Sequence, residues 1–256
     1  MTNAIPANYT PASDALKDRV ILVTGAGAGI GQAVAIECAR RGATVVLLGR
    51  TQAKLEATYD AIEKIDAPRA AILTLDLGAS TVAEFVGVAE SLHREYGRLD
   101  GLAHIAGVLG VRTPLDHYDA KVWTQVLAVN LTAPFLLTQA LLPVLRKARS
   151  PSVVFTSSGV GHKGRAFWGA YAVSKFGLEG LMQVWADECD GGTAPVRMNS
   201  LNPGPVRTQM RLEAYPGEDR DALATPDAVA PGFVYLLGDA SSGVTGQAFD
   251  LARRPL

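Results

Sequence analysis

The chain has 256 residues, of which 48% are apolar and 19% charged, and its formal net charge is −1. A chain of this size and composition can bury one large core and is unlike a disordered protein. The balanced charge argues against nucleic acid or an anionic membrane as a partner. The two cysteines, Cys38 and Cys189, form no disulfide framework and lack metal-ligand spacing. We therefore expect a reduced, cytoplasmic protein without a metal site.

The first 18 residues are polar, contain Pro6 and Pro11, and lack the basic-then-apolar pattern of a secretory signal. We expect them to form an extended N-terminal arm (1–18), followed by a single domain over residues 19–256. The most apolar stretch, Ala133–Leu145, is too short to span a bilayer, so we expect no membrane association.

From Val20 onward, short aliphatic runs alternate with segments of helical period. The runs are apolar almost throughout, which is typical of parallel strands covered by helices on both faces. A capping box at Thr81 and Glu84 and the pair Thr225-Pro226 indicate helix starts. This pattern predicts an α/β fold, a single doubly wound Rossmann-type domain with a seven-stranded, mostly parallel sheet flanked by helices. The expected strands are 20–23, 44–48, 70–75, 99–105, 152–156, 196–201 and 248–251.

A glycine-rich turn (TGAGAGIG, residues 24–31) follows the first strand and opens the first helix. Glycines allow a tight turn and a close approach of a pyrophosphate, whose charge the free N–H groups of the helix attract. The spacing departs from the strict G-x-G-x-x-G pattern, and a plain strand-to-helix connection is the alternative. We expect Thr24, Gly25, Ala28, Gly29, Ile30 and Gly31 to bind a dinucleotide.

The second strand ends at Arg50, where an NAD-binding chain usually has an acid for the ribose hydroxyls. A guanidinium suits a 2′-phosphate, so NADP(H) is preferred, with NAD(H) possible. The alternative for Arg50 is a solvated helix start. Asp76, followed by Leu77, comes after the third strand and can face the adenine, although aspartate there is often only a turn former.

Tyr171 and Lys175 lie four residues apart in a helical segment, so they share a face. A nearby cation lowers the pKa of a tyrosine, which then exchanges a proton with a carbonyl oxygen more readily near neutral pH. Tyr-x-x-x-Lys by itself also occurs on ordinary amphipathic helices.

The motifs together resemble the short-chain dehydrogenase/reductase family over residues 20–250. They occur in the family's order and include the glycine turn, Asp76-Leu77, Asn130, Ser157-Ser158, Tyr171-x-x-x-Lys175 and Asn202-Pro203-Gly204-x-Val206-x-Thr208. Within the family, Leu48-Gly49-Arg50 and Trp168-Gly169-Ala170-Tyr171 look most similar to YciK-like bacterial oxidoreductases, which bring no settled substrate.

The resemblance implies a role for each matching residue. Ser158, thirteen residues before Tyr171, would hydrogen-bond the substrate oxygen. Tyr171 and Lys175 would also contact the cofactor, Lys175 at the nicotinamide ribose. Asn130 would bend its helix and hold a water of a proton relay. The backbone at Ala106 and Gly107 would run past the nicotinamide ribose. Pro203, Gly204 and Thr208 would contact the nicotinamide side of the cofactor.

The chain departs from the family's Asn-Asn-Ala-Gly motif, because it has His104-Ile105-Ala106-Gly107. We expect His104 to replace an asparagine structurally, with some loss of local rigidity. His162 lies near the active-site strand end and is a candidate substrate contact. The substrate side combines a charged segment (207–224) with an apolar wall at 108–110 and Phe167-Trp168.

The segment 121–145 is apolar on more than one face, so one side is expected to meet the sheet and the other a second subunit. Burial of that other side under the chain's own loops is the alternative. The family pairing of this helix with the Tyr171 helix implies a homodimer or homotetramer. We expect an NADP(H)-dependent oxidoreductase of small-molecule carbonyl or alcohol substrates. A 3-oxoacyl-thioester reductase and a catalytically silent NADP(H)-binding sensor are the alternatives.

Overall fold

The structure is a computed structural model and describes residues 3–6, 9–191 and 194–251. Within this part of the chain, seven strands form one parallel sheet in the order β3-β2-β1-β4-β5-β6-β7. The strand order reverses between β1 and β4, which is the switch point of a doubly wound fold. The expected Rossmann-type fold is confirmed. The strands are β1 (Val20–Thr24), β2 (Thr44–Gly49), β3 (Ala71–Thr74), β4 (Gly101–His104), β5 (Ser152–Thr156), β6 (Arg197–Asn202) and β7 (Ala248–Asp250).

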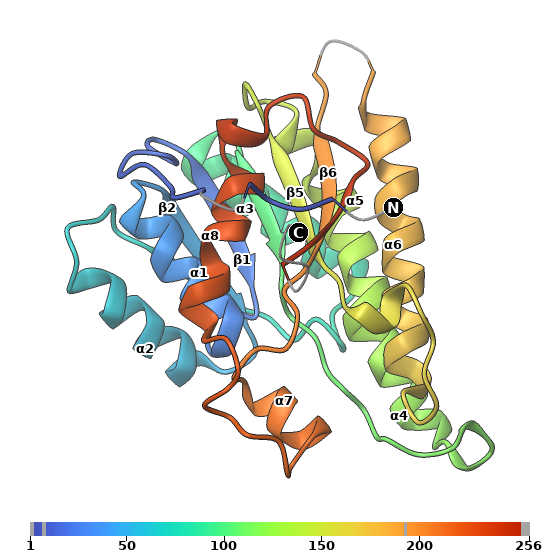
Figure 1. Cartoon of the computed structure of the whole chain (residues 1–256). Coiled ribbons are helices and arrows are strands. Elements are labelled where there is room, and N and C mark those ends of the chain that lie inside the picture. Colours follow the sequence, from blue (N-terminus) through green and yellow to red (C-terminus); the bar gives the residue numbers. More distant parts are fainter. Residues whose placement is uncertain (1–2, 7–8, 192–193, 252–256) are drawn as a thin grey trace.

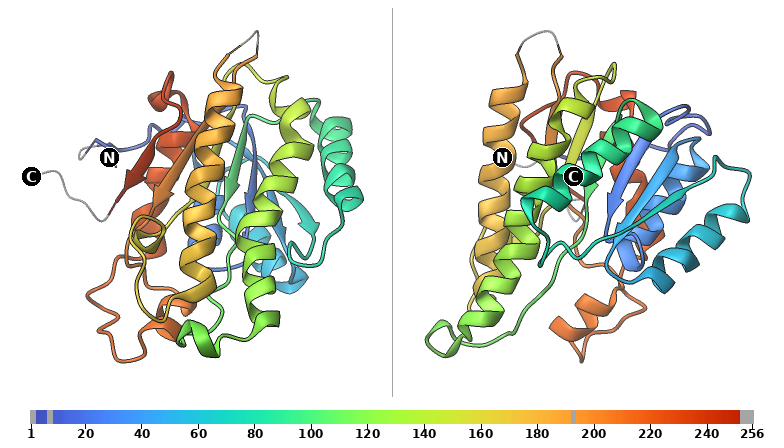
Figure 2. Two further views of the ribbon diagram at one scale, coloured as in Figure 1. Left: turned by 90° about the vertical axis from the view of Figure 1, so that its right-hand side faces the viewer. Right: turned by 180° about the vertical axis from the view of Figure 1, so that it is seen from behind.

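Helices lie on both faces of the sheet (Figures 1 and 2). They are α1 (Gly29–Arg40), α2 (Gln52–Glu63), α3 (Val82–Tyr96), α4 (Ala120–Leu127), α5 (Ala133–Leu145), α6 (Gly169–Cys189), α7 (Gln209–Ala214) and α8 (Pro226–Leu237). Ile21 packs in the core with Val34 of α1 and Phe233 of α8. Its neighbour Leu22 packs in the opposite core with Phe85 of α3 and Leu137 of α5. Because successive strand residues face opposite sides, two cores require apolar residues throughout the strand.

Local caps set the helix ends that the sequence indicated. The Thr81 side chain accepts a hydrogen bond from Glu84 N at 3.3 Å, and Glu84 accepts one from Thr81 N at 2.7 Å, which completes the capping box of α3. Gly97 ends α3 with a φ of 73°, a left-handed conformation that glycine adopts without a Cβ clash. The Thr225 side chain likewise accepts from Ala228 N at the start of α8.

The helical segment Ala120–Leu145 is longer than the apolar stretch singled out in the sequence. Its 26 residues join α4 and α5 through a π-helical turn, Ala128–Thr132, and are long and apolar enough to cross a membrane by length and composition. The length argument against a membrane span therefore does not hold for this segment. In the structure α5 packs on α3 and contributes residues to the core, and α4 packs on α6, but only 39% of the apolar window is buried.

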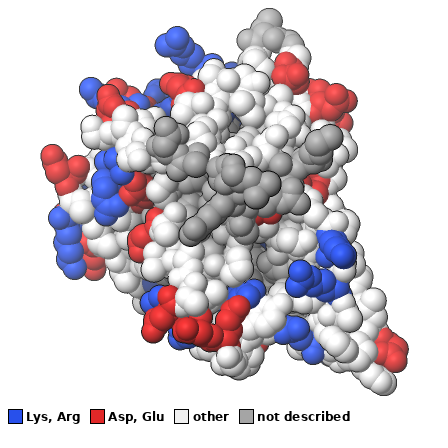
Figure 3. Space-filling model, in the orientation of Figure 1, with Lys and Arg blue, Asp and Glu red and all other residues white. Residues whose placement is uncertain are grey.

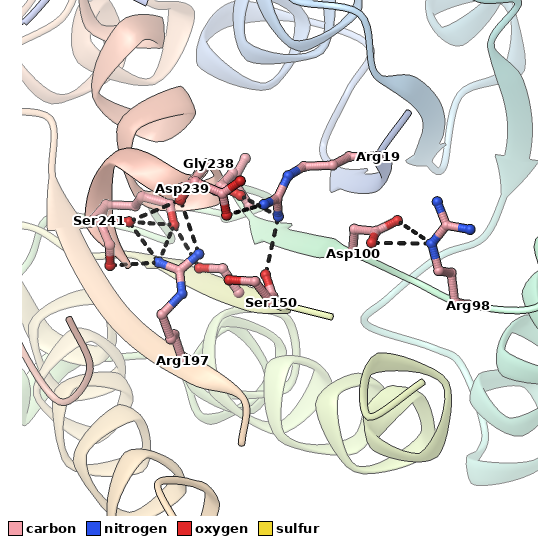
Figure 4. Close-up of polar contacts among 11 residues, drawn as sticks. Arg19, Arg98, Asp100, Ser150, Arg197, Gly238, Asp239 and Ser241 are labelled. Atoms are coloured by element: carbon pink, nitrogen blue, oxygen red, sulfur yellow. Dashed lines mark hydrogen bonds and ion pairs between the residues drawn. The ribbon is translucent and has the colours of Figure 1, made fainter. Parts of the chain in front are cut away.

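Two arginines hold the carboxyl end of α8 near the amino ends of the strands (Figure 4). Arg197 of β6 donates to the Leu236 and Gly238 carbonyls, each at 3.1 Å. Arg19 donates to the Leu237 carbonyl at 3.3 Å and pairs with Asp239. Cations there satisfy carbonyls that lack helical partners and oppose the negative end of the helix dipole. Burial lowers the pKa of Arg197 to about 10.

The N-terminal arm lies along the β7 edge of the sheet. Asn3 N donates to the Ala248 carbonyl at 2.7 Å, and Asp250 N donates to the Asn3 carbonyl at 3.0 Å. Further along, the Tyr9 ring packs edge-on against Tyr235 of α8, with ring centroids 5.0 Å apart. The arm thereby pairs backbone groups of an edge strand that would otherwise be open to another chain.

Candidate active site

A cavity of about 450 Å³ opens at the carboxyl ends of the strands, between the glycine-rich turn and α7. This is the edge where doubly wound folds bind ligands. The residues predicted for the cofactor and for catalysis gather on its wall, although Thr24 and Asn130 lie behind it. Those on the wall are Gly25, Ala28, Gly29, Ile30, Gly31, Arg50, Asp76, Leu77, Ala106, Gly107, Ser158, Tyr171, Lys175, Pro203, Gly204 and Thr208.

The glycine-rich turn has no room for larger side chains at two of its positions. A Cβ on Gly31 would lie 2.1 Å from the Gly25 carbonyl oxygen, and one on Gly25 would lie 2.9 Å from Ala106 Cα. Gly29, the first residue of α1, has a φ of 57°. No side chain caps the start of α1, so its first N–H groups are available to a ligand in the cavity. This arrangement fits a pyrophosphate.

Two cations lie at the far end of the cavity from Tyr171. Arg50 follows β2, and Lys54, which sequence reasoning did not single out, joins it from the first turn of α2. Lys54 packs under Gly27, where a Cβ would lie 2.8 Å from Lys54 Cβ. Asp76 also lines the cavity, but its Oδ1 accepts a hydrogen bond from Gly78 N at 3.0 Å, so it forms a turn as well.

Thr24 acts on the cavity through the backbone of the neighbouring strand. Its hydroxyl accepts hydrogen bonds from Ile105 N at 2.9 Å and Ala106 N at 3.1 Å. It is 1% exposed and does not line the cavity, so its influence on a ligand is indirect. This contact fixes the end of β4 where the family's paired asparagines are replaced.

His104 occupies the place of the first missing asparagine and is buried. Its Nε2 lies 2.8 Å from Thr138 Oγ1 of α5, and its ring stacks on Phe155 with centroids 5.0 Å apart. Burial, with a smaller contribution from the nearby Lys175 cation, lowers the pKa of His104 to about 3. A neutral imidazole thus links β4 to α5, as expected of a structural replacement.

Tyr171, Ser158 and Lys175 meet at the inner end of the cavity. The Lys175 Nζ lies 5.6 Å from the Tyr171 ring centre and donates to the Thr156 carbonyl at 2.6 Å. Burial lowers the pKa of Lys175 to about 8, against the opposing effect of the Glu179 carboxylate. The pKa of Tyr171 is raised rather than lowered as expected, because burial outweighs its hydrogen bond with Ser158. The phenol therefore holds its proton at neutral pH.

Asn130 lies in the π-helical turn, where the regular helix is interrupted. The bend expected of the helix there stays a prediction. The Asn130 Oδ1 accepts from Val108 N at 2.8 Å, and its Nδ2 donates to the Val108 carbonyl at 2.9 Å and to Ser174 Oγ at 3.1 Å. These contacts tie the loop after β4 to α6, next to Lys175. π-Helical turns are common at functional sites.

The geometry agrees with comparisons to known proteins. The family model "short chain dehydrogenase" matches residues 19–219. The chain belongs to this family.

Its relatives include bacterial oxidoreductases of the expected branch. The dehydrogenase is 46% identical to the uncharacterized oxidoreductase YciK of Escherichia coli strain K12, over 95% of each chain. A short chain dehydrogenase from Shigella flexneri 2a, solved in complex with NADP, has a TM-score of 0.91 at 45% identity, covering 94% of this chain and 100% of that one. One from E. coli CFT073, in complex with NADPH, has a TM-score of 0.90 at 47% identity, covering 94% and 99%.

His162 contacts a buried carboxylate and not the cavity, so it is not the substrate contact suggested by the sequence. Its Nε2 lies 3.4 Å from Glu179 Oε1, and His162 does not line the cavity. Glu179 is buried one helical turn beyond Lys175 and accepts hydrogen bonds from Ser200 Oγ at 2.9 and 2.8 Å. Glu179 was not singled out from the sequence, although its position four residues after Lys175 places both on one helix face. His162, its neighbour from a separate turn, could not be identified from spacing.

The substrate side is formed by loops rather than by the sheet. Val108, Leu109 and Trp168 line the cavity as expected, together with Met210 of α7. Phe167 was expected on this wall but is 51% exposed and turned outward. Its φ of 69° reverses the chain locally, so consecutive aromatic side chains point to opposite sides. A positive φ at a phenylalanine could not be anticipated from sequence.

Proposed function

We propose that this dehydrogenase transfers a hydride between NADP(H) and a carbonyl or secondary alcohol substrate, with Tyr171 as general acid and base. The observation that carries the proposal is the meeting of Tyr171, Ser158 and Lys175 in one cavity whose other end holds a glycine turn and Arg50. The complexes of two relatives with NADP and NADPH support the choice of cofactor.

The residues of the cavity fit this cofactor. The N–H groups at the start of α1 would face the pyrophosphate, with Gly25, Gly29 and Gly31 leaving space for it, and Arg50 with Lys54 would pair with the 2′-phosphate. Asp76 and Leu77 would lie at the adenine, and Ala106 and Gly107 along the ribose. Pro203, Gly204 and Thr208 would border the nicotinamide, which when bound supplies or accepts the hydride.

The chain's own residues handle the proton. Ser158 would orient the substrate oxygen toward the Tyr171 hydroxyl, which donates its proton in reduction and accepts one in oxidation. Lys175 stabilises the phenolate that remains, because its ammonium lies beside the ring. Asn130 fixes the loop that borders this pair and, by family resemblance, would hold a relay water.

The reaction is tested by NADPH oxidation against a panel of aldehydes, diketones, quinones and 3-oxoacyl thioesters. We expect turnover of at least one uncharged carbonyl class, and a loss of at least about a thousandfold in kcat for Tyr171→Phe with NADPH affinity within about threefold. NADPH binding without turnover of any carbonyl would favour the silent sensor. Strong selectivity for thioesters would favour the 3-oxoacyl-thioester reductase.

The cofactor preference is tested at Arg50. Arg50→Asp should raise the KM for NADPH by about tenfold or more and leave that for NADH little changed, because only NADPH carries the 2′-phosphate. Lys17→Asp, at an exposed lysine before β1, is the matched control. Equal effects of Arg50→Asp on both cofactors would contradict the assignment.

We further propose a cytoplasmic homodimer or homotetramer that acts on small molecules and has no nucleic-acid or membrane partner. An exposed apolar face supports the oligomer. It consists of Phe135 of α5 with Val173, Phe176 and Val184 of α6. On the face seen in Figure 3, Lys and Arg lie among Asp and Glu without a broad single-sign patch, which gives no support to a polyanion partner.

A further inference from the structure

Three segments that close the substrate side meet at one arginine. Arg112 lies in the loop after β4, the loop that carries Leu109. Trp168 precedes α6 and is 9% exposed, and Ala214 ends α7. Leu109, Trp168 and Ala214 all line the cavity. Arg112 itself is exposed and stands behind this wall.

The Arg112 guanidinium contacts the other two segments at once. Its Cζ lies 5.0 Å from the centre of the Trp168 ring and 4.9 Å from that of Tyr215. Its Nη1 donates to the Ala214 carbonyl, one of the carbonyls at the end of α7 that lack a helical partner. Each contact is of the cation–π or charge-assisted type, in which a planar guanidinium is stronger than an ammonium.

The backbone around Trp168 is held in a sparsely populated conformation. Phe167 has a φ of 69°, which costs a non-glycine residue about 1 kcal/mol, and Gly169 has a φ of 32°. This elbow turns the indole inward, where its ring centre lies 5.7 Å from that of Tyr171. Such strain persists only where surrounding contacts hold it. Arg112 supplies one such contact, on the Trp168 indole. Tyr118 supplies another, because it packs where a Gly169 Cβ would lie.

Both guanidinium groups at this wall, those of Arg112 and Arg211, are already engaged by protein groups. Arg211 lines the cavity, but Glu218 binds its Nε and Nη2 at 2.5 Å each, and the Arg211 Cζ lies 4.0 Å from the Tyr215 ring centre. Arg112 is engaged by the Ala214 carbonyl and two rings. The wall therefore presents the indole of Trp168 with methionine and alanine surface to a substrate, while the guanidinium groups of Arg112 and Arg211 are held by other contacts.

We propose that Arg112 is a specificity-determining positioning residue, which joins Trp168 to α7 as a fixed apolar wall and so selects uncharged carbonyl compounds with an aromatic or alicyclic body. The proposal rests on the proposed reductase function and narrows its substrate class. Arg112 acts through Trp168 and Ala214, so its removal alters the fit of the non-reacting part of the substrate more than proton transfer at Tyr171.

The test compares Arg112→Met and Arg112→Lys with Arg165→Met, at an exposed arginine three residues before Trp168. The probes are 1-phenyl-1,2-propanedione, 2,3-butanedione and benzoylformate. We expect the wild type to prefer the phenyl diketone over both others. Both Arg112 variants should raise the KM for the phenyl diketone about tenfold, with kcat and the KM for butanedione within twofold. Arg165→Met should change neither.

Two further measurements do not depend on turnover. In the NADP⁺-loaded protein, Arg112→Met should weaken calorimetric binding of the phenyl diketone about tenfold. It should also speed amide hydrogen exchange in residues 165–170 and 209–216, while Arg165→Met leaves both unchanged. Unchanged exchange, an equal rise in KM for both diketones, or a wild-type preference for benzoylformate overturns the proposal. If the wild type turns over none of the probes but Arg112→Met still changes binding and exchange as expected, the proposed reaction is overturned. The role of Arg112 is then still supported.

Discussion

Lys175 must stay charged in a buried position if it is to stabilise a phenolate, and Glu179 helps it to do so. Burial lowers the Lys175 pKa to about 8, and the Glu179 carboxylate one turn away opposes that shift. Gly161, which precedes α6 in the chain, packs closely against Lys175. A Cβ at this glycine would lie 3.0 Å from Lys175 Cβ, so a larger residue would crowd the lysine. The turn that follows then places His162 beside Glu179. His104, which also lies near the ammonium, is held neutral because burial lowers its pKa to about 3.

Replacement of Glu179 should therefore move the alkaline limb of the pH profile. In Glu179→Gln the Lys175 ammonium loses its carboxylate, so its pKa falls further and the ammonium deprotonates at lower pH. We expect the alkaline decline of kcat/KM for NADPH-dependent reduction to begin about one pH unit lower in the variant than in the wild type. The profile is measured between pH 6 and 10 with the best carbonyl substrate.

Two variants separate charge from structure in that experiment. Glutamine can still accept the hydrogen bond from Ser200, so the melting temperature of Glu179→Gln should remain close to that of the wild type. Glu188→Gln removes an exposed carboxylate from the end of the same helix and should leave the profile in place. A uniform loss of activity at every pH, without a shift of the limb, would assign Glu179 a purely structural role.

At the scale of elements, His104 connects a central strand to a helix. Its pKa is near 3 in the folded chain and about 6.5 when unfolded, so the folded state binds fewer protons between these values. The stability that the neutral imidazole contributes is present above about pH 6.5 and is lost as the pH falls through this window. The bond between His104 and Thr138, and with it the contact of β4 with α5, is thus sensitive to acid.

His104→Asn should make the protein less sensitive to acid. Between pH 7 and pH 5 the wild type should lose about 2 kcal/mol of unfolding free energy through this residue, and the asparagine variant should not. Urea denaturation at the two pH values measures the difference. His117→Asn, at an exposed histidine, is the control and should behave as the wild type. A loss in His104→Asn equal to that of the wild type would show that other groups cause the acid response.

The elements themselves were largely predictable, because two buried sheet faces impose continuous apolar runs and caps mark helix starts. Strand ends differ by one or two residues, as at β4, where the expected 99–105 is Gly101–His104. The residues of the proposed cofactor side could also be recognised in the sequence. The glycines leave space at the backbone and Arg50 supplies a positive charge, and both follow directly after a strand. The division into an arm and one domain stays a prediction.

The substrate side could not be predicted for a physical reason. Its wall depends on contacts between Arg112, Trp168 and Tyr215, which are far apart in the chain and share no period or spacing. The outward turn of Phe167 follows from a local φ that sequence does not encode strongly. Similarly, the raised pKa of Tyr171 reflects how deeply the phenol is buried, whereas spacing revealed only the neighbouring lysine.

At the scale of the whole molecule, one exposed apolar face lies on α6, the helix that carries the proposed catalytic pair Tyr171 and Lys175. Val173 and Phe176 are each 45% exposed on α6, and Val184, on the same helix, is 56% exposed. Phe135 of α5 stacks on Trp185 beside them, with ring centroids 6.2 Å apart. Because Tyr171 and Lys175 belong to α6, a partner subunit bound to this face would also stabilise the positions of these two side chains.

Val184→Glu should therefore weaken self-association and, with it, activity. A glutamate buried in an apolar contact loses hydration without gaining a partner, so we expect at least a tenfold weaker subunit affinity by analytical ultracentrifugation. Val82→Glu introduces the same charge at a valine that is 57% exposed on α3 and serves as the matched control. At protein concentrations where Val184→Glu is monomeric, kcat/KM should fall several-fold and recover as concentration rises. If the two variants have the same mass in solution, the subunits meet elsewhere, and the exposed face of α6 requires another explanation.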